Sequence, residues 1–255
     1  MIKRKLGILG GGQLGMFICQ AAKKNGITTT IFSEKKTFSA KKFCDSYIIG
    51  KYSNNELLNK FIRSSDFFTI ETENIPKEVL KKIEKNKQIF PSSKIIEIAQ
   101  NRIKEKKFIN SIDGVKTVRY LPVNNYKDLV NGFRKLGDKA LLKSCQFGYD
   151  GKGQYLINSS NISQFKKKKL KNFIIEEFLE FNKEISIIIS RTKKNIINYP
   201  PVENLHEDSI LKETLYPAVL DEKILENAIK ISKKIAINLE LIGILAIEMF
   251  VLKNN

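Results

Sequence analysis

The sequence predicts two consecutive domains that mix helices and strands: an α/β, Rossmann-like domain over residues 1–95 and an α+β domain over residues 96–255. Three observations support this fold class. Up to about residue 95, short apolar runs alternate with amphipathic stretches, which is the pattern of βαβ units and a parallel sheet. After Pro91 the pattern changes to two helical segments, followed by short strands that alternate with helices. A chain of 255 residues is long enough to bury a substantial core.

Apolar periodicity places the elements in order. In the first domain we expect strands at Lys5–Leu9, Ile27–Phe32, Tyr47–Ile49 and Phe67–Ile70, and helices at 13–25, 55–63 and 76–86. In the second we expect helices at about 93–112, 125–136, 161–169 and 220–239. The strands expected there are 117–121, 139–143, 153–157, 173–178, 184–190, 196–199 and Ile242–Val251, the last of them buried.

A net charge of +18 is typical of proteins that bind nucleic-acid backbones. The basic residues, however, are 39 Lys and 6 Arg spread along the whole chain. Base-reading proteins rely on Arg for bidentate contacts, and no helix-turn-helix, zinc-finger or RNP-type motif occurs. We therefore expect no nucleic-acid partner. A non-catalytic RNA-binding module stays an alternative, which a steep salt dependence of RNA binding would support.

Few side chains are available for a metal centre or a catalytic triad. Cys19, Cys44 and Cys145 are far apart, and His206 is the single histidine, so neither a disulfide framework, a zinc site nor a Ser-His-Asp triad is indicated. No apolar run is long enough to cross a bilayer, and the basic start runs into Gly10–Gly12 without a signal-peptide core. We expect a cytoplasmic protein with no membrane partner.

Two motifs of the first domain follow predicted strands. Gly10–Gly15 (GGGQLG) opens the first helix, so backbone amides and the positive helix end would face a bound anion. It matches GxGxxG, and Glu34 is a candidate for ribose binding, which makes an NAD-binding oxidoreductase an alternative. Glu71 and Glu73 follow the strand Phe67–Ile70. They are either a carboxylate pair for a sugar hydroxyl or an amine, or an acidic cluster at the next helix N-terminus.

The stretch Gly148–Gln154 (GYDGKGQ) predicts a phosphate-covering loop beside Lys143. Its three glycines let backbone N–H groups approach an anion without interference from Cβ atoms. Lys143 and Lys152 would supply charge to triphosphate oxygens. Gly-Lys-Gly between two strands is also a common hairpin tip, and this loop alone does not decide between the two interpretations.

Carboxylates at two further places suggest contacts with a nucleotide or a metal. In the connector after Glu176 and Glu177, main-chain groups can pair with an adenine edge, and a carboxylate further on, such as Glu184, can hold ribose hydroxyls. Glutamates at a strand end are usually only solvated. Glu248 interrupts the apolar run Ile242–Val251, so we expect a buried carboxylate that is paired or bound to a metal.

The order and spacing of these motifs resemble the ATP-grasp superfamily and, within it, the 5-(carboxyamino)imidazole ribonucleotide synthase family of purine biosynthesis. The resemblance runs from about Leu6 to the last residues. It is carried by Gly10–Gly15, Glu71–Pro76 (ETENIP), Gln100-Asn101-Arg102 with Glu105-Lys106, Gly148–Gln154, Ile175–Leu179 (IEEFL), Glu184-Ile185-Ser186, Asn204-Leu205-His206 and Ala246-Ile247-Glu248. It implies a pre-ATP-grasp domain followed by an incomplete ATP-grasp domain, with a lid subdomain at about 115–176.

The resemblance also implies roles for individual residues. The ATP phosphates would be bound by Arg102, Lys143, Gly148, Tyr149, Asp150, Gly151, Lys152, Gly153 and Gln154, with Lys143 and Lys152 as catalytic cations. Glu176, Glu177, Phe178 and Leu179 would frame adenine, Glu184 would hold ribose, and His206 would line the nucleotide site. Gly12, Gln13 and Glu73 would lie on the aminoimidazole ribonucleotide side, and Glu248 would be the first ligand of Mg²⁺.

The implied activity is a carbon–nitrogen bond-forming ligase reaction in IMP biosynthesis. ATP and bicarbonate would form carboxyphosphate, which would carboxylate 5-aminoimidazole ribonucleotide to 5-carboxyaminoimidazole ribonucleotide, with a closing lid excluding water. The full-length enzyme would be a homodimer. A formate-dependent ATP-grasp ligase is a sister alternative, although GYDGKGQ and ENIP favour the carboxylating family.

Three features depart from the family pattern. Met16 stands where arginine is usual, and Phe147 stands where glycine is usual. The chain ends at Asn255, before the segment in which the family carries its second metal-binding carboxylate. We therefore expect a fragment that binds nucleotide weakly and turns over little or not at all.

Overall fold

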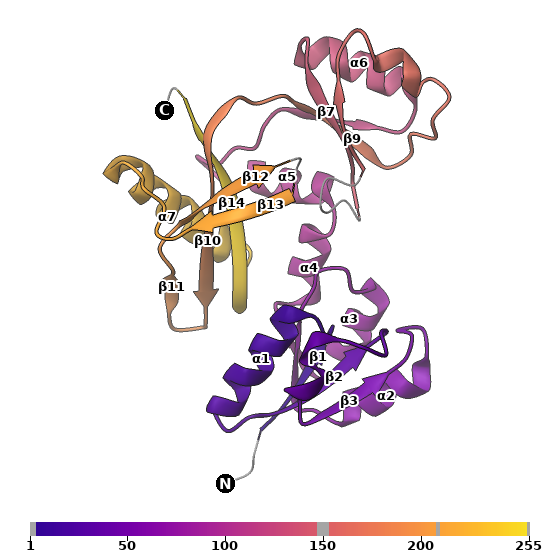
Figure 1. The fold of residues 1–255 in the computed structure, drawn as a ribbon, viewed down its shortest axis with the longest axis vertical. Coiled ribbons are helices and arrows are strands. Elements are labelled where there is room, and N and C mark those ends of the chain that lie inside the picture. Colours follow the sequence, from indigo (N-terminus) through magenta and orange to yellow (C-terminus); the bar gives the residue numbers. More distant parts are fainter. Residues whose placement is uncertain (1–3, 147–152, 208–209, 254–255) are drawn as a thin grey trace. The chain divides into compact units, whose positions relative to one another are not determined.

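A computed structural model describes residues 4–146, 153–207 and 210–253, and the chain divides into two compact units, residues 1–97 and 98–255 (Figure 1). The helix α4 (Ser93–Ala99) runs across the boundary between the two units. No helix in the described part of the chain combines the length and the hydrophobicity that crossing a membrane demands.

The first unit contains the parallel sheet that the sequence predicts. Its strands are, in spatial order, β3 (Ser46–Ile49), β2 (Thr28–Ser33), β1 (Lys5–Leu9), β4 (Phe67–Ile70) and β5 (Gln88–Phe90), and every neighbouring pair is parallel. The connecting helices are α1 (Gln13–Lys24), α2 (Asn55–Arg63) and α3 (Lys77–Glu84), with a short 3₁₀ turn, η1, at Ser39–Lys42. Parallel strands need such crossover connections, so the alternation seen in the sequence follows from the topology.

Helices cover both faces of this sheet, and alternate strand residues supply the two cores. Ile8 faces a cluster that includes Cys19 of α1, whereas its neighbour Leu9 belongs to a cluster with Phe61 of α2 and Ile83 of α3. Successive side chains of a strand point to opposite faces, which explains why both residues are fully buried. This is a doubly wound architecture.

The second unit begins with α5 (Arg102–Asn110) and a four-stranded antiparallel sheet. The strand order is β6 (Tyr120–Val123), β9 (Phe173–Glu177), β7 (Ala140–Ser144) and β8 (Gln154–Ile157). One face packs on α6 (Tyr126–Leu136) through a cluster that includes Leu129, Leu142 and Ile175, and η2 (Ile162–Phe165) adds Phe165. The opposite face is therefore available for polar side chains.

A second antiparallel sheet completes this unit. Its order is β11 (Ile196–Asn198), β10 (Phe181–Arg191), β12 (Val202–Glu207) and β13 (Ile210–Leu215), and β14 (Gly243–Leu252) also pairs with β10. The helix α7 (Glu222–Asn238) packs on one face through Ala228, against Ile185, Ile187 and Val251. Figure 1 shows α7 beside β10 and β14.

Asparagine side chains begin three of the helices. Asn101 starts α5, where its Oδ1 accepts the N–H groups of Ile103 and Lys104, each at 3.1 Å. Asn54 caps α2 and Asn125 caps α6 in the same way. Such caps satisfy donors that a helix leaves unpaired at its first turn, and they fix where each helix starts.

Several sequence predictions of local structure were wrong. The expected helix at 161–169 is only the single turn η2, because Lys166–Lys169 offers no apolar side chain to continue a buried face. The strands β5, β12 and β13 were not predicted, and every residue of β13 is exposed, so it has no buried face to give an alternating signal. The strand at 242–251 exists as β14, but only alternate residues such as Ile247 and Val251 are buried.

Replacing Phe61 tests the core of the first unit. Its ring is fully buried and lies edge-on to Phe32 and Phe68, with centroids 5.5 and 5.2 Å away. We expect Phe61→Ala to lower the free energy of unfolding by about 3–5 kcal/mol in urea titrations. The matched control, Phe17→Ala, removes a side chain that is 49% exposed, and we expect it to cost less than about 1 kcal/mol. Equal losses in the two variants would contradict this assignment of the core.

Candidate active site

A buried carboxylate lies on the polar face of the four-stranded sheet. Glu176 is directly opposite Leu141 in the β7–β9 register, so Lys143, two residues along β7, projects from the same face. Nζ of Lys143 lies 2.9 Å from Oε2 of Glu176. Gln154 is directly opposite Lys143 in the β7–β8 register, which places it on this face as well.

The second oxygen of Glu176 has a cation of its own. Lys106 of α5 places its Nζ 3.2 Å from Oε1, and the same ammonium lies 5.8 Å from the centroid of the Tyr120 ring. Glu176 is only 3% exposed. Burial raises the pKa of Glu176, but the charges of Lys143 and Lys106 outweigh it, so the pKa is lowered overall. Burial lowers the pKa of Lys106, although Glu176 opposes this shift.

The helix α5 brings further charges to the same place. Arg102, Glu105 and Lys106 are spaced i, i+3 and i+4, which puts them on one face of the helix. Burial raises the pKa of Glu105; Arg102 and Lys106 oppose the shift, whereas Glu176 and Glu248 add to it. The N–H of Arg102 donates to the carbonyl of Cys145 at 3.0 Å, which ties the start of α5 to the end of β7.

The second sheet contributes a pair from β10 and β12. Nδ1 of His206 lies 3.4 Å from Oε2 of Glu184, which makes an ion pair when the imidazole is protonated. Burial raises the pKa of Glu184; His206 and Lys143 oppose the shift and Glu248 adds to it. The Glu184 carboxylate is therefore influenced by Lys143 of the four-stranded sheet as well as by His206 of its own sheet.

A ladder of polar side chains holds β10, β12 and β13 together beside this pair. Nδ2 of Asn204 donates to Oγ of Ser186 at 2.8 Å, and Oγ1 of Thr214 donates to Oδ1 of Asn204 at 3.2 Å. Asn204 is only 8% exposed. Ser186 is directly opposite Glu248 in the β10–β14 register, so the ladder leads from the strand that carries His206 to the strand that carries Glu248.

Glu248 is exposed, which corrects the prediction that it is buried. It alternates with Ile247, which lies opposite Ile187 of β10 and is 8% exposed. Among the residues that the structure describes, no three His, Cys, Asp or Glu side chains are close enough together to hold a metal ion. An exposed carboxylate in the field of Glu184 is nevertheless suitable for Mg²⁺, which usually binds one or two carboxylates together with substrate phosphates and water.

In the first unit, the glycine-rich turn holds a carboxylate. A Cβ atom on Gly10 or on Gly12 would overlap the Glu71 carboxylate, and the Glu71 Cγ lies 3.4 Å from where a Cβ of Gly15 would be. Gly12 is the N-cap of α1, so the side chain of Glu71 lies at the positive end of this helix. Gly10 has a φ of +100°, a backbone conformation that favours glycine, whereas a Cβ at Gly12 would require the end of the Glu71 side chain to shift.

This arrangement argues against the dinucleotide-binding alternative. A pyrophosphate at the start of α1 would have to displace the Glu71 carboxylate, which already occupies the anion-favouring position. Glu34, the candidate ribose ligand, instead accepts the N–H of Tyr52 at 2.9 Å. Burial, with the charges of Glu34 and Glu71 nearby, raises the pKa of Tyr52.

The structure brings some of the predicted site residues together and not others. The cluster of the second unit includes Arg102, Lys143, Glu176, Glu184, His206 and Glu248. Glu177 instead receives two hydrogen bonds from the exposed guanidinium of Arg119, at 2.9 and 3.0 Å. Phe178 is 37% exposed, with Lys139 over its ring, and Leu179 is half-buried.

The predicted phosphate loop is described only at its end. Gly148, Tyr149, Asp150, Gly151 and Lys152 lie outside the described residues, as does Phe147. Gly153 has a φ of +72°, and its carbonyl accepts the N–H of Ser144 at 2.9 Å. In the first unit, Gln13 and Glu73 are exposed and Gly12 is half-buried.

The sequence interpretation gave no roles to Glu105 and Lys106. It named Glu71 and Glu73 as a candidate carboxylate pair but assigned only Glu73 to the ribonucleotide side. The sequence contains a signal for the first pair, because the segment that forms α5 has charged residues at i, i+3 and i+4; in the structure this helix has no buried residue. A helix with no apolar face points to a polar environment. Nothing local distinguishes Glu71 from Glu73, since only the fold places Gly10 and Gly12 against Glu71.

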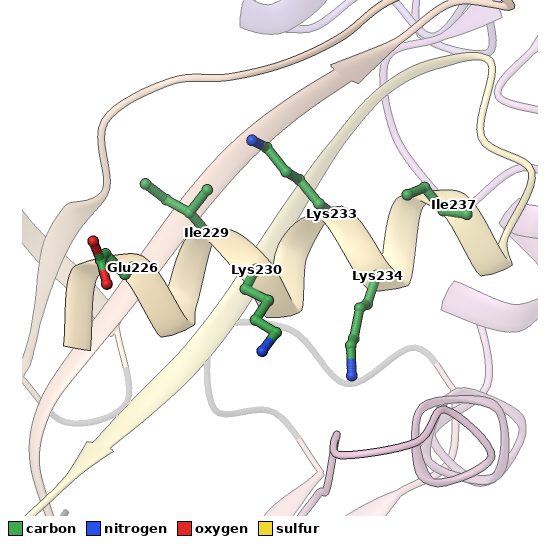
Figure 2. A pocket seen from close by; sticks show the side chains of 6 residues that line it. All are labelled: Glu226, Ile229, Lys230, Lys233, Lys234 and Ile237. Carbon is green, nitrogen blue, oxygen red and sulfur yellow. The ribbon is translucent and has the colours of Figure 1, made fainter. Parts of the chain in front are cut away.

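A hollow lies elsewhere on the second unit, along α7. Figure 2 shows its lining, which comes from this one helix: Glu226, Ile229, Lys230, Lys233, Lys234 and Ile237. Lys234 donates to the carbonyl of Asp113 at 2.7 Å. The residues that line the hollow include none of the charged cluster around Glu176, so the hollow does not contribute to the candidate site.

Comparisons with known proteins match one family model to each of the two units of the chain. Residues 3–100 match the ribonucleotide synthetase preATP-grasp domain, and residues 109–255 match the ATP-grasp domain. A bifunctional purine synthesis protein purC/E of Dictyostelium discoideum is 38% identical over 98% of this chain, which covers 26% of that protein. The N5-carboxyaminoimidazole ribonucleotide synthase of Brucella melitensis is 32% identical over 98% of this chain, which covers 70% of that protein.

A solved structure matches both units. The crystal structure of N5-carboxyaminoimidazole synthase from Aspergillus clavatus, in complex with ADP and 5-aminoimidazole ribonucleotide, has a TM-score of 0.88 and 26% sequence identity. The match covers 99% of this chain and 67% of that chain.

The pH dependence of stability tests the pairing of Glu176. Since the folded pKa of this carboxyl is lowered, its ionised form stabilises the fold above the ordinary carboxyl pKa of about 4.3, and the contribution is lost as the pH falls through the lowered value. We expect Glu176→Gln to lower the free energy of unfolding by about 3 kcal/mol at pH 7, with the difference shrinking below about pH 4. Urea titrations from pH 7 to pH 3 measure this difference in the free energy of unfolding.

Glu180→Gln is the control, because Glu180 pairs with Lys253 at an exposed position. A difference between wild type and Glu176→Gln that stays constant down to pH 3 would contradict the pairing.

A double-mutant cycle tests the contact between Gly12 and Glu71. A Cβ at position 12 would force the end of the Glu71 side chain to shift, so we expect Gly12→Ala to lower the free energy of unfolding by about 1 kcal/mol. In a Glu71→Ala background the same change should cost less than about 0.5 kcal/mol, because the overlapping atoms are gone. Additive effects in the cycle would show that the two residues do not touch.

Proposed function

The chain belongs to the N5-carboxyaminoimidazole ribonucleotide synthase family of the ATP-grasp superfamily, and we propose that it serves the ATP-dependent carboxylation of 5-aminoimidazole ribonucleotide in purine biosynthesis. The observation that carries the proposal is the cluster around Glu176. It combines two half-buried lysines, of which Lys143 can turn toward phosphates, with the Glu184–His206 pair and the exposed carboxylate of Glu248. Cations, ribose acceptors and a hard oxygen donor are the groups that a metal-bound nucleoside triphosphate requires.

The proposed nucleotide contacts follow the cluster from α5 to β12. Arg102 and Lys143 bind the phosphates, together with the loop of Gly148, Tyr149, Asp150, Gly151, Lys152, Gly153 and Gln154. Lys143 and Lys152 are the proposed catalytic cations. The strand end and connector of Glu176, Glu177, Phe178 and Leu179 frame adenine, Glu184 holds ribose, and His206 lines the site. The ion pairs of Lys143 with Glu176 and of His206 with Glu184 support this arrangement.

The proposed metal is Mg²⁺, with Glu248 as its protein ligand beside the phosphate oxygens. When bound, the ion would neutralise part of the negative charge of the phosphates. The exposure of Glu248 supports this role, because a carboxylate on an exposed strand face can reach a bound ligand without first losing a buried partner.

The proposed chemistry proceeds in two steps. An oxygen of bicarbonate attacks the γ-phosphorus of ATP, which forms carboxyphosphate and releases ADP. The exocyclic amine of the ribonucleotide then attacks the carboxyl carbon, a C–N bond forms, and phosphate leaves. The cationic side chains orient the phosphates and stabilise the charge that develops on them. A lid at about residues 115–176 would exclude water from the acyl phosphate.

The ribonucleotide side belongs to the domain of about residues 1–95. Gly12, Gln13 and Glu73 are the proposed contacts, and Glu71 is a further carboxylate beside Gly12. Bicarbonate as carboxyl donor, a cytoplasmic location and a homodimer are further parts of the proposal, and the similarity to this enzyme family supports them.

Nucleotide binding by the purified chain tests the proposal. We expect calorimetry with ADP to give saturable heat at up to millimolar ligand. We expect Lys143→Met to weaken the affinity at least about tenfold, because a charged phosphate contact is lost. Lys60→Met, a change at an exposed position of α2, should leave the affinity unchanged. Absence of ADP binding by the wild-type chain would overturn the proposed function.

A further inference from the structure

We propose that Lys106 is a positioning residue of the nucleotide site, which keeps the Glu176 carboxylate neutralised and in place when Lys143 turns from that carboxylate to the nucleotide phosphates. The identity of the ligand rests on the proposed function above. The role of Lys106 rests on the geometry around Glu176.

Each carboxylate oxygen of Glu176 contacts a different lysine. Lys143 contacts Oε2 at 2.9 Å and Lys106 contacts Oε1 at 3.2 Å. The carboxylate is almost fully buried, so it is stable as an ion only while at least one cation stays beside it. Sharing one carboxylate between two cations allows either lysine to leave without stranding a buried charge.

The surroundings indicate which lysine leaves. Lys143 lies opposite Gln154, at the strand pair that frames the loop ending at Gly153, and it also acts on the charge of Glu184 in the other sheet. Lys106 lies between Glu176 and the Tyr120 ring, on a helix whose start is fixed by the Asn101 cap and by the bond from Arg102 N–H to the Cys145 carbonyl. Lys143 is therefore the exchangeable partner and Lys106 the fixed one.

Without Lys106, the movement of Lys143 toward phosphates would leave Glu176 buried and unpaired, facing further negative charge. Phosphate binding would then have to break the remaining ion pair, and the affinity for the nucleotide would fall. Neutralising Glu176 itself would remove this requirement. This relation separates a positioning role of Lys106 from a direct phosphate contact.

Calorimetric titration of ADP into five forms of the chain tests the inference. These are wild type, Lys106→Met, Lys106→Arg, the double variant Lys106→Met with Glu176→Gln, and the control Lys107→Met at an exposed position of the same helix. We expect Lys106→Met to lower the ADP affinity about tenfold or more. Lys106→Arg should stay within about threefold of wild type, because the positive charge is kept. Lys107→Met should bind as wild type does.

The double variant distinguishes the mechanisms. We expect Glu176→Gln to restore most of the affinity that Lys106→Met loses, because no buried charge then needs a partner. Wild-type affinity in Lys106→Met, or no recovery in the double variant, would overturn the inference while leaving the proposed function intact. Absence of ADP binding by the wild type would overturn both. If Lys106→Met does not fold, a loss of affinity in the folded Lys106→Arg variant well beyond threefold overturns the inference as well.

Discussion

The burial of one carboxylate sets the arrangement of the second unit. Glu176 is on the central strand pair of its sheet, and a carboxylate in that position needs cations close by. One cation comes from the neighbouring strand and the other from α5, so the neutralisation of this carboxylate links the helix to the sheet.

The local charge balance differs from that of the chain as a whole. The chain carries a net charge of +18, whereas the cluster contains the cations Arg102, Lys106 and Lys143 and the carboxylates Glu105, Glu176, Glu184 and Glu248. An incoming anion therefore meets lysines that already have carboxylate partners. At the proposed nucleotide site, recognition of a phosphate would depend on the exchange of ion-pair partners, and general electrostatic attraction by a basic surface would contribute only to the approach.

The sequence predicts the parallel sheet, the order of the two domains and most of the charged cluster, because those features leave local signals. Apolar periodicity marks elements with one buried face, such as α7, and Lys143 stands at the end of the apolar run of β7. The prediction that Glu248 is buried was wrong, because an alternating edge strand and a buried strand have similar composition over a few residues. The partners of Glu71 and of Lys106 could not be identified from local sequence, since they lie 59 to 61 and 70 positions away in the chain. The all-exposed β13 leaves no periodic pattern at all.

Asn204 has a consequence for the alignment of the strands that surround it. The hairpin of β12 and β13 has little apolar side-chain packing to set how far one strand slides along the next. The Asn204 amide makes both of these hydrogen bonds only in the register that places Ser186 and Thr214 beside it. The two bonds therefore favour a single register of the three strands. If β12 slipped by two residues, every side chain would stay on the same face of the sheet. His206, however, would move about 7 Å along the strand, away from Glu184. The distance between the imidazole and its carboxylate is thus set by a neutral amide that touches neither of them.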